Sequence, residues 1–170
     1  MSPVLVRLAE PAEFDTVARL TLAAYEADGQ LKDDRSYAPT LADVATRAGA
    51  GELLVAVDEA SGRLLGSVTF VLPGSRYAEL SGAGEAEFRM LSVDPAAQGR
   101  GVGEALTRAC LSRAAALGCH AVVISTRTFT EPAHRLYRRV GFVRTPAADW
   151  SPVPGVDLIA WRYDLTAAGR

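Results

Sequence analysis

Residues 90–103 read Met-Leu-Ser-Val-Asp-Pro-Ala-Ala-Gln-Gly-Arg-Gly-Val-Gly, and this stretch decides the fold that we expect. An apolar strand runs into a proline turn, and glycines at positions 99, 101 and 103 then lead into a long helix. Glycine allows sharp backbone turns, and the first turn of a helix leaves N–H groups without intrahelical partners. These amides lie at the positive end of the helix dipole, so the stretch predicts an anion-binding site.

Two common nucleotide-binding loops do not fit the glycine spacing. A mononucleotide P-loop needs Gly-Lys followed by Ser or Thr, whereas Gly103 is followed by Glu104 and Ala105. The dinucleotide fingerprint also fails, because the residues three positions after Gly101 and Gly103 are Glu104 and Leu106. The loop is therefore either a tight structural turn or the seat of a different phosphate-bearing cofactor.

The residues around these glycines resemble motif A of the GNAT superfamily of acyl-CoA-dependent N-acetyltransferases. In that motif, Gln/Arg-x-x-Gly-x-Gly/Ala follows a strand and a short turn, and Gln98 begins the matching run. A second signature of the superfamily, Ala-x-x-Leu-Tyr-x-x-x-Gly-Phe, is matched by residues 133–142. The two motifs occur in the expected order, and the resemblance covers roughly residues 53–165.

The resemblance implies an α/β fold of the GNAT type. We expect a central, mostly antiparallel mixed sheet, with splayed parallel strands at its centre to admit the pantetheine arm and helices on both faces. At 170 residues the chain is long enough for a substantial core, and we predict one N-acetyltransferase domain over residues 1–170.

Hydrophobic periodicity and turn residues predict the individual elements. We expect strands at residues 4–8, 52–57, 64–72, 86–93, 121–124, 142–145 and 158–165. Helices are expected from Pro11 through Tyr25, over residues 41–48, from the glycines to Leu117, and from Thr130 to Val140. We expect the connecting loops to shape the acceptor pocket, and they comprise residues 27–39, 73–84 and 146–155.

The resemblance implies that acetyl-CoA is the co-substrate. The main chain of Leu91, Ser92 and Val93 is expected to pair with the pantetheine arm like an added strand. N–H groups are expected to surround the pyrophosphate, and they belong to Gly99, Arg100, Gly101, Val102, Gly103 and Glu104. The side chain of Arg100 either adds a charge to the phosphates or is simply solvated at the helix start.

Two positions depart from relatives that resemble ribosomal-protein N-terminal acetyltransferases. Thr130 stands where many of them carry Asn, and its hydroxyl can still hydrogen-bond pantetheine. Ser125 stands where they carry a glutamate base. This counts against acetylation of ribosomal proteins, while transfer to another amine by another base remains open.

Tyr137 is the candidate general acid that the resemblance implies, because this tyrosine lies near the acyl-CoA thiol in the family and protonates the departing thiolate. A tyrosine that only packs in the core is the alternative.

An attacking ammonium must also lose a proton, so a base is needed. Strand alternation places Glu85, Glu87 and Arg89 on one face, and Glu87 occupies the family position of a strand-borne glutamate base. A solvated strand face or a partner for Arg89 is the alternative role of Glu87, and Glu85 or water is the substitute base.

We therefore expect an acetyl-CoA-dependent N-acetyltransferase that moves an acetyl group to a primary amine of a small molecule or peptide by direct attack in a ternary complex. One alternative is a noncatalytic acyl-CoA-binding or sensing module. Transfer of a longer acyl group, or transfer to a hydroxyl, is another alternative.

Composition favours none of the classes that need strong charge, metal or membrane insertion. The net charge of −2 and the pI near 5.7 give no reason to expect nucleic acid as a partner. Two histidines without clustered ligands make a metal site unexpected, and Cys110 and Cys119 suit reduced thiols. With no signal peptide and no apolar run of about 18 residues, we expect a cytoplasmic protein without a membrane span, for which a homodimer stays open.

Three side chains outside the motifs attract attention. Cys119 and His120 are adjacent, so on a strand they point to opposite faces and cannot act as nucleophile and base. His134 is expected to be an exposed helix residue. Asp149 and Trp150 either contact a cationic acceptor or pack their proline-stiffened loop onto the sheet.

Overall fold

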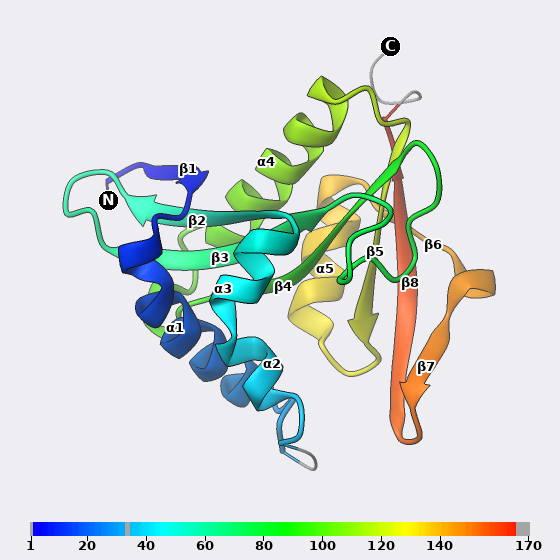
Figure 1. Cartoon of the computed structure of the whole chain (residues 1–170), viewed down its shortest axis with the longest axis horizontal. Coiled ribbons are helices and arrows are strands. Elements are labelled where there is room, and N and C mark those ends of the chain that lie inside the picture. The colour runs from blue at the N-terminus through cyan, green and yellow to red at the C-terminus, as the bar shows by residue number, and fades with distance from the viewer. Residues whose placement is uncertain (1, 33–34, 166–170) are drawn as a thin grey trace. The chain divides into compact units, whose positions relative to one another are not determined.

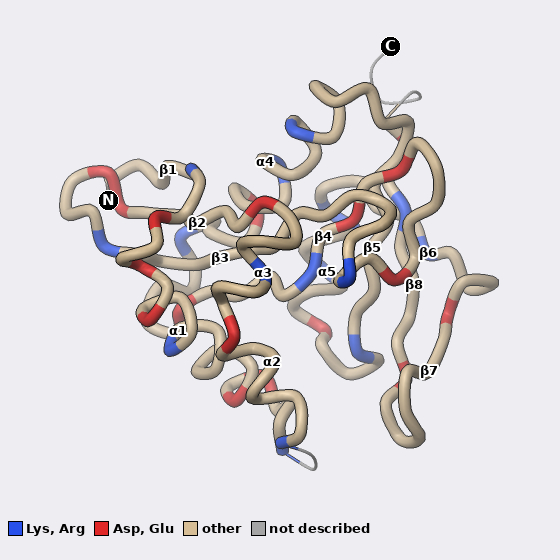
Figure 2. The backbone as a smooth tube through the Cα atoms, in the orientation of Figure 1, with Lys and Arg blue, Asp and Glu red and all other residues tan. Residues whose placement is uncertain are grey.

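The computed structural model describes residues 2–32 and 35–165 (Figure 1). These residues group into two compact units: unit 1 lies within Met1–Phe70 and Met90–Ala109, and unit 2 within Val71–Arg89 and Cys110–Arg170. Strand β4 (Glu85–Val93) and helix α4 (Val102–Ala116) contribute residues to both units. Figure 2 shows acidic and basic residues interspersed along the chain, in keeping with the small net charge.

Unit 1 begins with three antiparallel strands in the order in which they occur in the chain. These are β1 (Val4–Leu8), β2 (Glu52–Asp58) and β3 (Leu64–Val71), and the end of β4 continues the order. Alternate residues of β2 pack against helices α1 (Phe14–Ala27) and α3 (Val44–Ala50). The buried cluster that results consists of Val17, Val44, Leu53, Val55 and Val57. Short 3-10 turns, η1 (Pro11–Glu13) and η2 (Pro95–Ala97), precede the two longer helices α1 and α4.

The predicted helix over residues 41–48 is wrong in detail, because two helices occupy this region. Helix α2 (Ala38–Ala42) ends at Asp43, whose ψ of 70° breaks the helical path, and α3 begins directly afterwards. The Asp43 carboxylate accepts a hydrogen bond from the Thr46 N–H, so it caps α3. Aspartate favours this capping role over a helix interior, which explains the break.

Unit 2 is built around β8 (Val156–Asp164). That strand pairs antiparallel with β5 (Ala121–Arg127), β6 (Val143–Arg144) and β7 (Trp150–Val153), and β4 pairs parallel with β5 through its first residues. Helix α5 (Glu131–Val140) connects β5 to β6. An aromatic core forms where α5 meets the sheet, and it comprises Phe88, Tyr137, Phe142 and Trp161.

The region predicted as the irregular connection 146–155 contains the 3-10 turn η3 (Pro146–Ala148) and strand β7. Its prolines suggested a loop, yet Pro152 is tolerated because a strand at an edge can lack one N–H donor. Strand β5 also extends three residues beyond the predicted 121–124, whereas β6 covers two of the four residues predicted at 142–145.

The predicted fold class is confirmed. Among the described residues, eight strands form a mixed sheet, in which β4 pairs parallel with β5. That register covers Glu85–Glu87 and 121–123, whereas the register of β5 with β8 continues to Arg127. In the part of the chain described, no helix combines the length and apolarity that crossing a membrane requires.

Candidate active site

Met90 interrupts the extended backbone of strand β4. This residue has a φ of 57°, which is uncommon for a residue with a side chain, and the hydroxyl of Ser92 donates to its carbonyl over 3.1 Å. The next three residues are Leu91, Ser92 and Val93, of which Ser92 is buried and the others half-buried. The irregular backbone conformation thus lies directly before the segment predicted to pair with pantetheine.

The glycine loop follows at once. Asp94 accepts from the Ala96 N–H and so holds the turn η2, and Gly99 and Gly101 then adopt φ values of 82° and 76°. A Cβ built on either glycine would meet no atom within 4 Å, so these two positions face open space. Helix α4 begins at Val102, which places the backbone N–H groups of its first turn directly after the two glycines.

Gly66 on β3 is a residue of this region that sequence reasoning missed. A Cβ there would lie 2.6 Å from the Ser92 carbonyl oxygen and 2.8 Å from Cγ1 of Val102. Only glycine lets β3 approach both β4 and the start of α4 so closely. An isolated glycine inside a strand pattern is a known sign of close backbone approach and could have indicated it.

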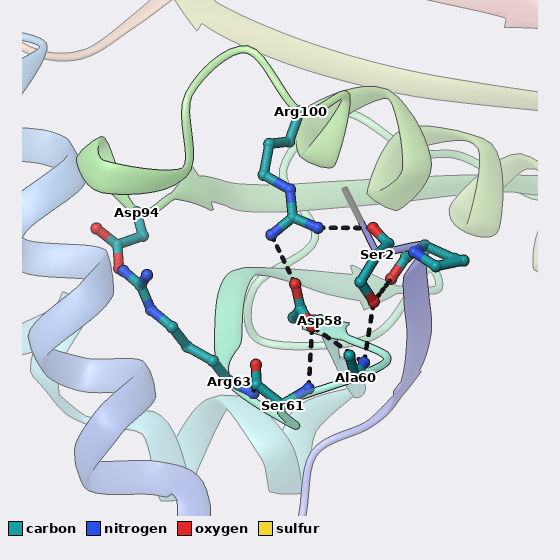
Figure 3. A network of polar contacts seen from close by, with 8 residues as sticks. Ser2, Asp58, Ala60, Ser61, Arg63, Asp94 and Arg100 are labelled. Atoms are coloured by element: carbon teal, nitrogen blue, oxygen red, sulfur yellow. Dashed lines mark hydrogen bonds and ion pairs between the residues drawn. The ribbon is translucent and has the colours of Figure 1, made fainter.

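Of the two roles predicted for the side chain of Arg100, the solvated one is wrong. Its guanidinium forms an ion pair with Asp58 (2.9 Å) and donates to the carbonyl of Ser2 (2.7 Å), as Figure 3 shows. Both partners of the ion pair are largely covered, with exposed side-chain fractions of 18% and 15%. The guanidinium of Arg100 is thus engaged by Asp58 and Ser2, and the backbone N–H of Arg100 is a candidate phosphate ligand.

In unit 2, Tyr137 projects from α5 into the aromatic core. Its ring centroid lies 6.0 Å from that of Phe88, 5.5 Å from Phe142 and 6.5 Å from Trp161, and only 4% of the residue is exposed. This packing restricts the ring to one orientation. The tyrosine is therefore a core residue as well as the candidate acid, because packing and proton donation use different parts of the side chain.

Glu87 is fully buried on the opposite face of β4 from Phe88. Its Oε1 accepts hydrogen bonds from the N–H groups of Glu79, Leu80 and Ser81 at 2.9, 3.0 and 3.1 Å. Among the described residues, its Oε2 is buried and has no hydrogen-bond partner. The solvated strand face considered above is wrong for Glu87, because the residue is fully buried. Its Oε1 binds the loop before β4, and its Oε2 is the atom that we consider as the candidate base.

Glu85 and Arg89 fasten the same loop at its two ends. Glu85 accepts from the Gly82 N–H over 2.8 Å, and Arg89 pairs with Glu79 over 2.7 Å while donating to the Tyr77 carbonyl. Glu79 is therefore an acidic partner of Arg89. Burial raises the pKa of Glu79, the Arg89 charge opposes that shift, and the nearby Glu87 adds to it.

Glu85 also forms a close ion pair with Arg162 of β8. Burial of the carboxyl works against ionisation, but the Gly82 N–H and Arg162 outweigh it and lower the pKa of Glu85. The Glu85 carboxylate is therefore already bound by the Gly82 N–H and by Arg162. Glu85 is consequently a poorer substitute base than Glu87, whose Oε2 has no such commitment among the described residues.

Replacing Glu85 by glutamine is expected to lower the free energy of unfolding by about 1 kcal/mol at neutral pH, because a charged acceptor is lost. The folded-state pKa of Glu85 lies below its usual 4.5, so the contribution is present above that pH and disappears as the pH falls through the folded-state pKa. Urea unfolding at neutral pH and at about pH 3 measures this, and the difference from wild type should shrink at the lower pH. A difference of the same size at both pH values would contradict it.

Thr130 occupies the N-cap position of α5 as predicted, but its side chain does not cap the helix. The hydroxyl donates instead to the Arg127 carbonyl over 3.1 Å, and its oxygen can still accept a hydrogen bond. The expectation that His134 is exposed is wrong: 3% of it is accessible, and its ring lies 5.5 Å from that of Trp161. Its Nε2 donates to the same Arg127 carbonyl over 2.9 Å, because a carbonyl only accepts.

Asp149 has a structural role. Its carboxylate binds both terminal nitrogens of Arg144 at 3.0 and 2.9 Å and accepts from the Ala160 N–H at 2.7 Å. Burial by itself would raise the pKa of Asp149, but the contacts with Arg144 and Ala160 outweigh it and lower that pKa. Of the two alternatives considered for this residue, the geometry favours packing of the loop onto β8 over contact with an acceptor.

Comparison with known proteins identifies the family. Residues 14–142, well over half of the chain, match the family described as the acetyltransferase (GNAT) family. This chain belongs to the GNAT family. The resemblance found in the two sequence motifs is thereby confirmed, as is the expectation of an acyltransferase at the level of the family.

The relatives of this GNAT chain include a mycothiol acetyltransferase of Cellulomonas flavigena. It is 39% identical over 110 residues, which cover 59% of this chain and 32% of that protein. The chain thus spans about a third of the length of this curated relative.

Solved structures confirm the GNAT fold. A GNAT acetyltransferase from Staphylococcus aureus has a TM-score of 0.74 at 14% identity, covering 96% of this chain and 99% of that one. The PaiA N-acetyltransferase of Thermoplasma acidophilum, solved in complex with coenzyme A, has a TM-score of 0.73 at 12% identity, covering 95% and 99%. At these identities the likeness concerns the fold alone.

Proposed function

We propose that this GNAT chain transfers an acetyl group from acetyl-CoA to a primary amine of a small molecule or peptide, by direct attack in a ternary complex. The observation that carries the proposal is the arrangement at β4 in unit 2. Tyr137 packs on Phe88 at one face of the strand, and Glu87 lies on the other face, where the register with β5 ends. A proton donor and a proton acceptor thus flank the point at which the two parallel strands stop pairing.

The loop in unit 1 has the chemistry that a pyrophosphate needs. Gly99 and Gly101 are in the left-handed region and face open space, so a ligand can approach the backbone there. The N–H groups of Val102, Gly103 and Glu104 belong to the first turn of α4, where the helix dipole favours negative charge. We assign these amides to the pyrophosphate and the main chain of residues 91–93 to pantetheine, with the Thr130 hydroxyl as an acceptor for a pantetheine amide.

The proposed reaction needs three proton transfers. Oε2 of Glu87 takes one proton of the acceptor ammonium, and the nitrogen lone pair then forms the new bond to the acetyl carbon. The bond from that carbon to sulfur breaks, and the Tyr137 hydroxyl supplies the proton that the departing thiolate needs. The nitrogen then loses its second proton, which restores the Tyr137 hydroxyl, so the two protons that the amine loses end on Glu87 and on the CoA sulfur. Proton transfer by a positioned side chain accelerates such steps by about 100-fold to 10,000-fold.

A noncatalytic acyl-CoA-binding module is the second candidate function. It is favoured by the three N–H bonds that Oε1 of Glu87 accepts, since a carboxylate that only anchors a loop would look the same on that oxygen. Turnover distinguishes the two candidates.

Acceptor-dependent release of free CoA thiol tests the proposal. The purified chain is incubated with acetyl-CoA and a panel of amines that comprises polyamines, aminoglycosides, amino acids and peptides. Thiol release with at least one amine is expected, whereas CoA binding without turnover on any amine would support the sensing module instead.

Replacing Gly101 by valine is expected to raise the Kd for CoA by about thirtyfold, because the side chain enters the open space in front of the amides and about 2 kcal/mol of charged hydrogen bonding is lost. Valine is also strained at a φ of 76°. Calorimetric titration with CoA measures the change.

Gly118 provides the matched control, because it has a φ of 79° and open space around its Cβ position, but lies after the C-terminal end of α4. Replacing Gly118 by valine should cost similar stability and leave the Kd for CoA unchanged. If both variants weaken CoA binding equally, or if neither does, the proposed pyrophosphate seat is wrong.

A further inference from the structure

The hairpin between β2 and β3 reaches both ends of the glycine loop in unit 1. Asp58, the last residue of β2, forms the ion pair with Arg100, and Arg63, just before β3, forms one with Asp94 over 2.9 Å (Figure 3). Two ion pairs thus connect the turn to the loop: Asp58 with Arg100, and Arg63 with Asp94. The two turn residues are five positions apart in sequence, and the two loop residues are six positions apart. Each contact joins segments more than thirty residues apart in sequence.

The turn itself is rigid. The N–H of Asp58 donates to the Arg63 carbonyl over 2.9 Å, and the N–H of Gly62 donates to the Asp58 carbonyl over 2.7 Å. Oδ1 of Asp58 also accepts from the N–H groups of Ala60 and Ser61, both at 3.0 Å. The Ser61 N–H and then the Arg100 guanidinium hold the pKa of Asp58 down at about 2, so this carboxylate is ionised at neutral pH.

The loop lacks comparable contacts at the glycines. Nothing lies within 4 Å of the Cβ positions of Gly99 and Gly101, so packing of side chains does not hold their backbone. Glycine also has more conformational freedom to lose than any other residue. An anion site made of backbone amides binds well only if the amides already point in the correct directions.

We propose that Asp58 is a positioning residue for the CoA pyrophosphate loop: through Arg100 it holds the glycine backbone in the conformation that presents its N–H groups to the cofactor. Arg63 assists it at the other end through Asp94. The proposal rests on the proposed function, because it assumes that residues 99–104 bind the pyrophosphate. It also explains why the Arg100 guanidinium points into the protein, since its task is to anchor the loop from behind.

Asp58 is expected to contribute more than Arg63. The Asp58–Arg100 pair is largely covered, whereas 55% of the Arg63 side chain is exposed, and exposed ion pairs are weak. The carbonyl of Ser2 adds a second hydrogen bond to Arg100, and the hydroxyl of Ser2 accepts from the Ala60 N–H over 2.9 Å. Ser2 and the turn between β2 and β3, which both contact Arg100, are therefore also hydrogen-bonded to each other.

The test compares how the Asp58→Asn variant binds two ligands, CoA and S-acetylpantetheine. Asparagine keeps an oxygen for the Ala60 and Ser61 N–H groups, so the turn should persist while the charge that holds Arg100 is lost. We expect the Kd for CoA to rise about fivefold, as the loss of one ion pair implies. Affinity for S-acetylpantetheine, which has no pyrophosphate, should stay at the wild-type value. Arg100→Gln should give the same pattern without altering the turn, and Arg63→Gln a smaller change in the same direction.

Glu13→Gln is the matched control, because it removes another ion pair of unit 1, that between Arg7 and Glu13 at 2.9 Å. This variant should bind CoA and S-acetylpantetheine with the wild-type affinities. An unchanged Kd for CoA in Asp58→Asn overturns the proposal. An equal loss of affinity for CoA and for S-acetylpantetheine also overturns it, because the substitution would then disturb the fold in general. Tighter CoA binding in Asp58→Asn that Arg100→Gln abolishes also overturns it, because Arg100 would then be a phosphate ligand that Asp58 withholds.

The proposed function fails separately from this inference. If the wild-type chain binds CoA and Gly101→Val does not, the pyrophosphate seat stands, and an unaffected Asp58→Asn variant refutes only the role of Asp58. If the wild-type chain binds no CoA, the proposed function and this inference are both refuted.

Discussion

The Tyr137→Phe variant should bind CoA like the wild type and lose about 1,000-fold in kcat, because proton donation to the leaving thiolate disappears while the aromatic packing remains. The ring of Tyr137 contacts Phe88, Phe142 and Trp161, and phenylalanine preserves these contacts. Steady-state thiol release at saturating acetyl-CoA and amine gives kcat, and calorimetry gives the Kd for CoA.

Tyr163→Phe is the matched control for this variant. Tyr163 lies on β8 and its ring also contacts Phe142, at 5.4 Å, but it has no role in the proposed reaction. Its replacement should change kcat by less than about twofold, as expected for a substitution away from the site. If Tyr137→Phe retains wild-type kcat, Tyr137 is a core tyrosine and no general acid.

The Glu87→Gln variant is expected to lose about 100-fold in kcat/KM for the amine at neutral pH, because the general base is removed. Glutamine still offers one oxygen to the N–H groups of Glu79, Leu80 and Ser81, so the loop should stay attached. Raising the pH supplies more free amine, and the rate of the variant should then approach that of the wild type. The pH dependence of kcat/KM is the decisive measurement.

Glu79→Gln serves as the control, because it removes a carboxylate from the same loop without removing the proposed base. Its ion pair with Arg89 has no role in the proposed reaction, so we expect a change of about threefold or less in kcat/KM. A Glu87→Gln variant whose rate stays low at every pH, with a raised KM for the amine, would mean that Glu87 only anchors the loop.

The fold was largely predictable because its deciding signals are local. The glycines at 99 and 101 adopt left-handed backbone conformations before α4, as their spacing indicated, and Gly141 ends α5 with a φ of 121°. Strand β7 was missed because it contains a proline, and the division into α2 and α3 was missed because Asp43 ends the first helix and caps the second. Tertiary pairing with β8 decides that residues 150–153 form a strand.

The candidate site was predictable in its positions and not in its contacts. Alternation along β4 correctly predicted that Glu85, Glu87 and Arg89 share a face, since all three bind the preceding loop. Sequence could not show that Glu87 is buried there, nor that His134 is buried against Trp161. Those outcomes depend on which distant segment covers each side chain.

The family and the glycine loop could be predicted from the sequence, because the φ requirements of glycine and the order of strand, turn and helix are properties of neighbouring residues. The contacts of the charged side chains depend instead on how distant segments pack. Asp58 and Arg100 are 42 residues apart, and nothing local pairs them. The hairpin brings them together, and it thereby pairs an arginine that sequence assigns to phosphate or solvent with a carboxylate of the same unit.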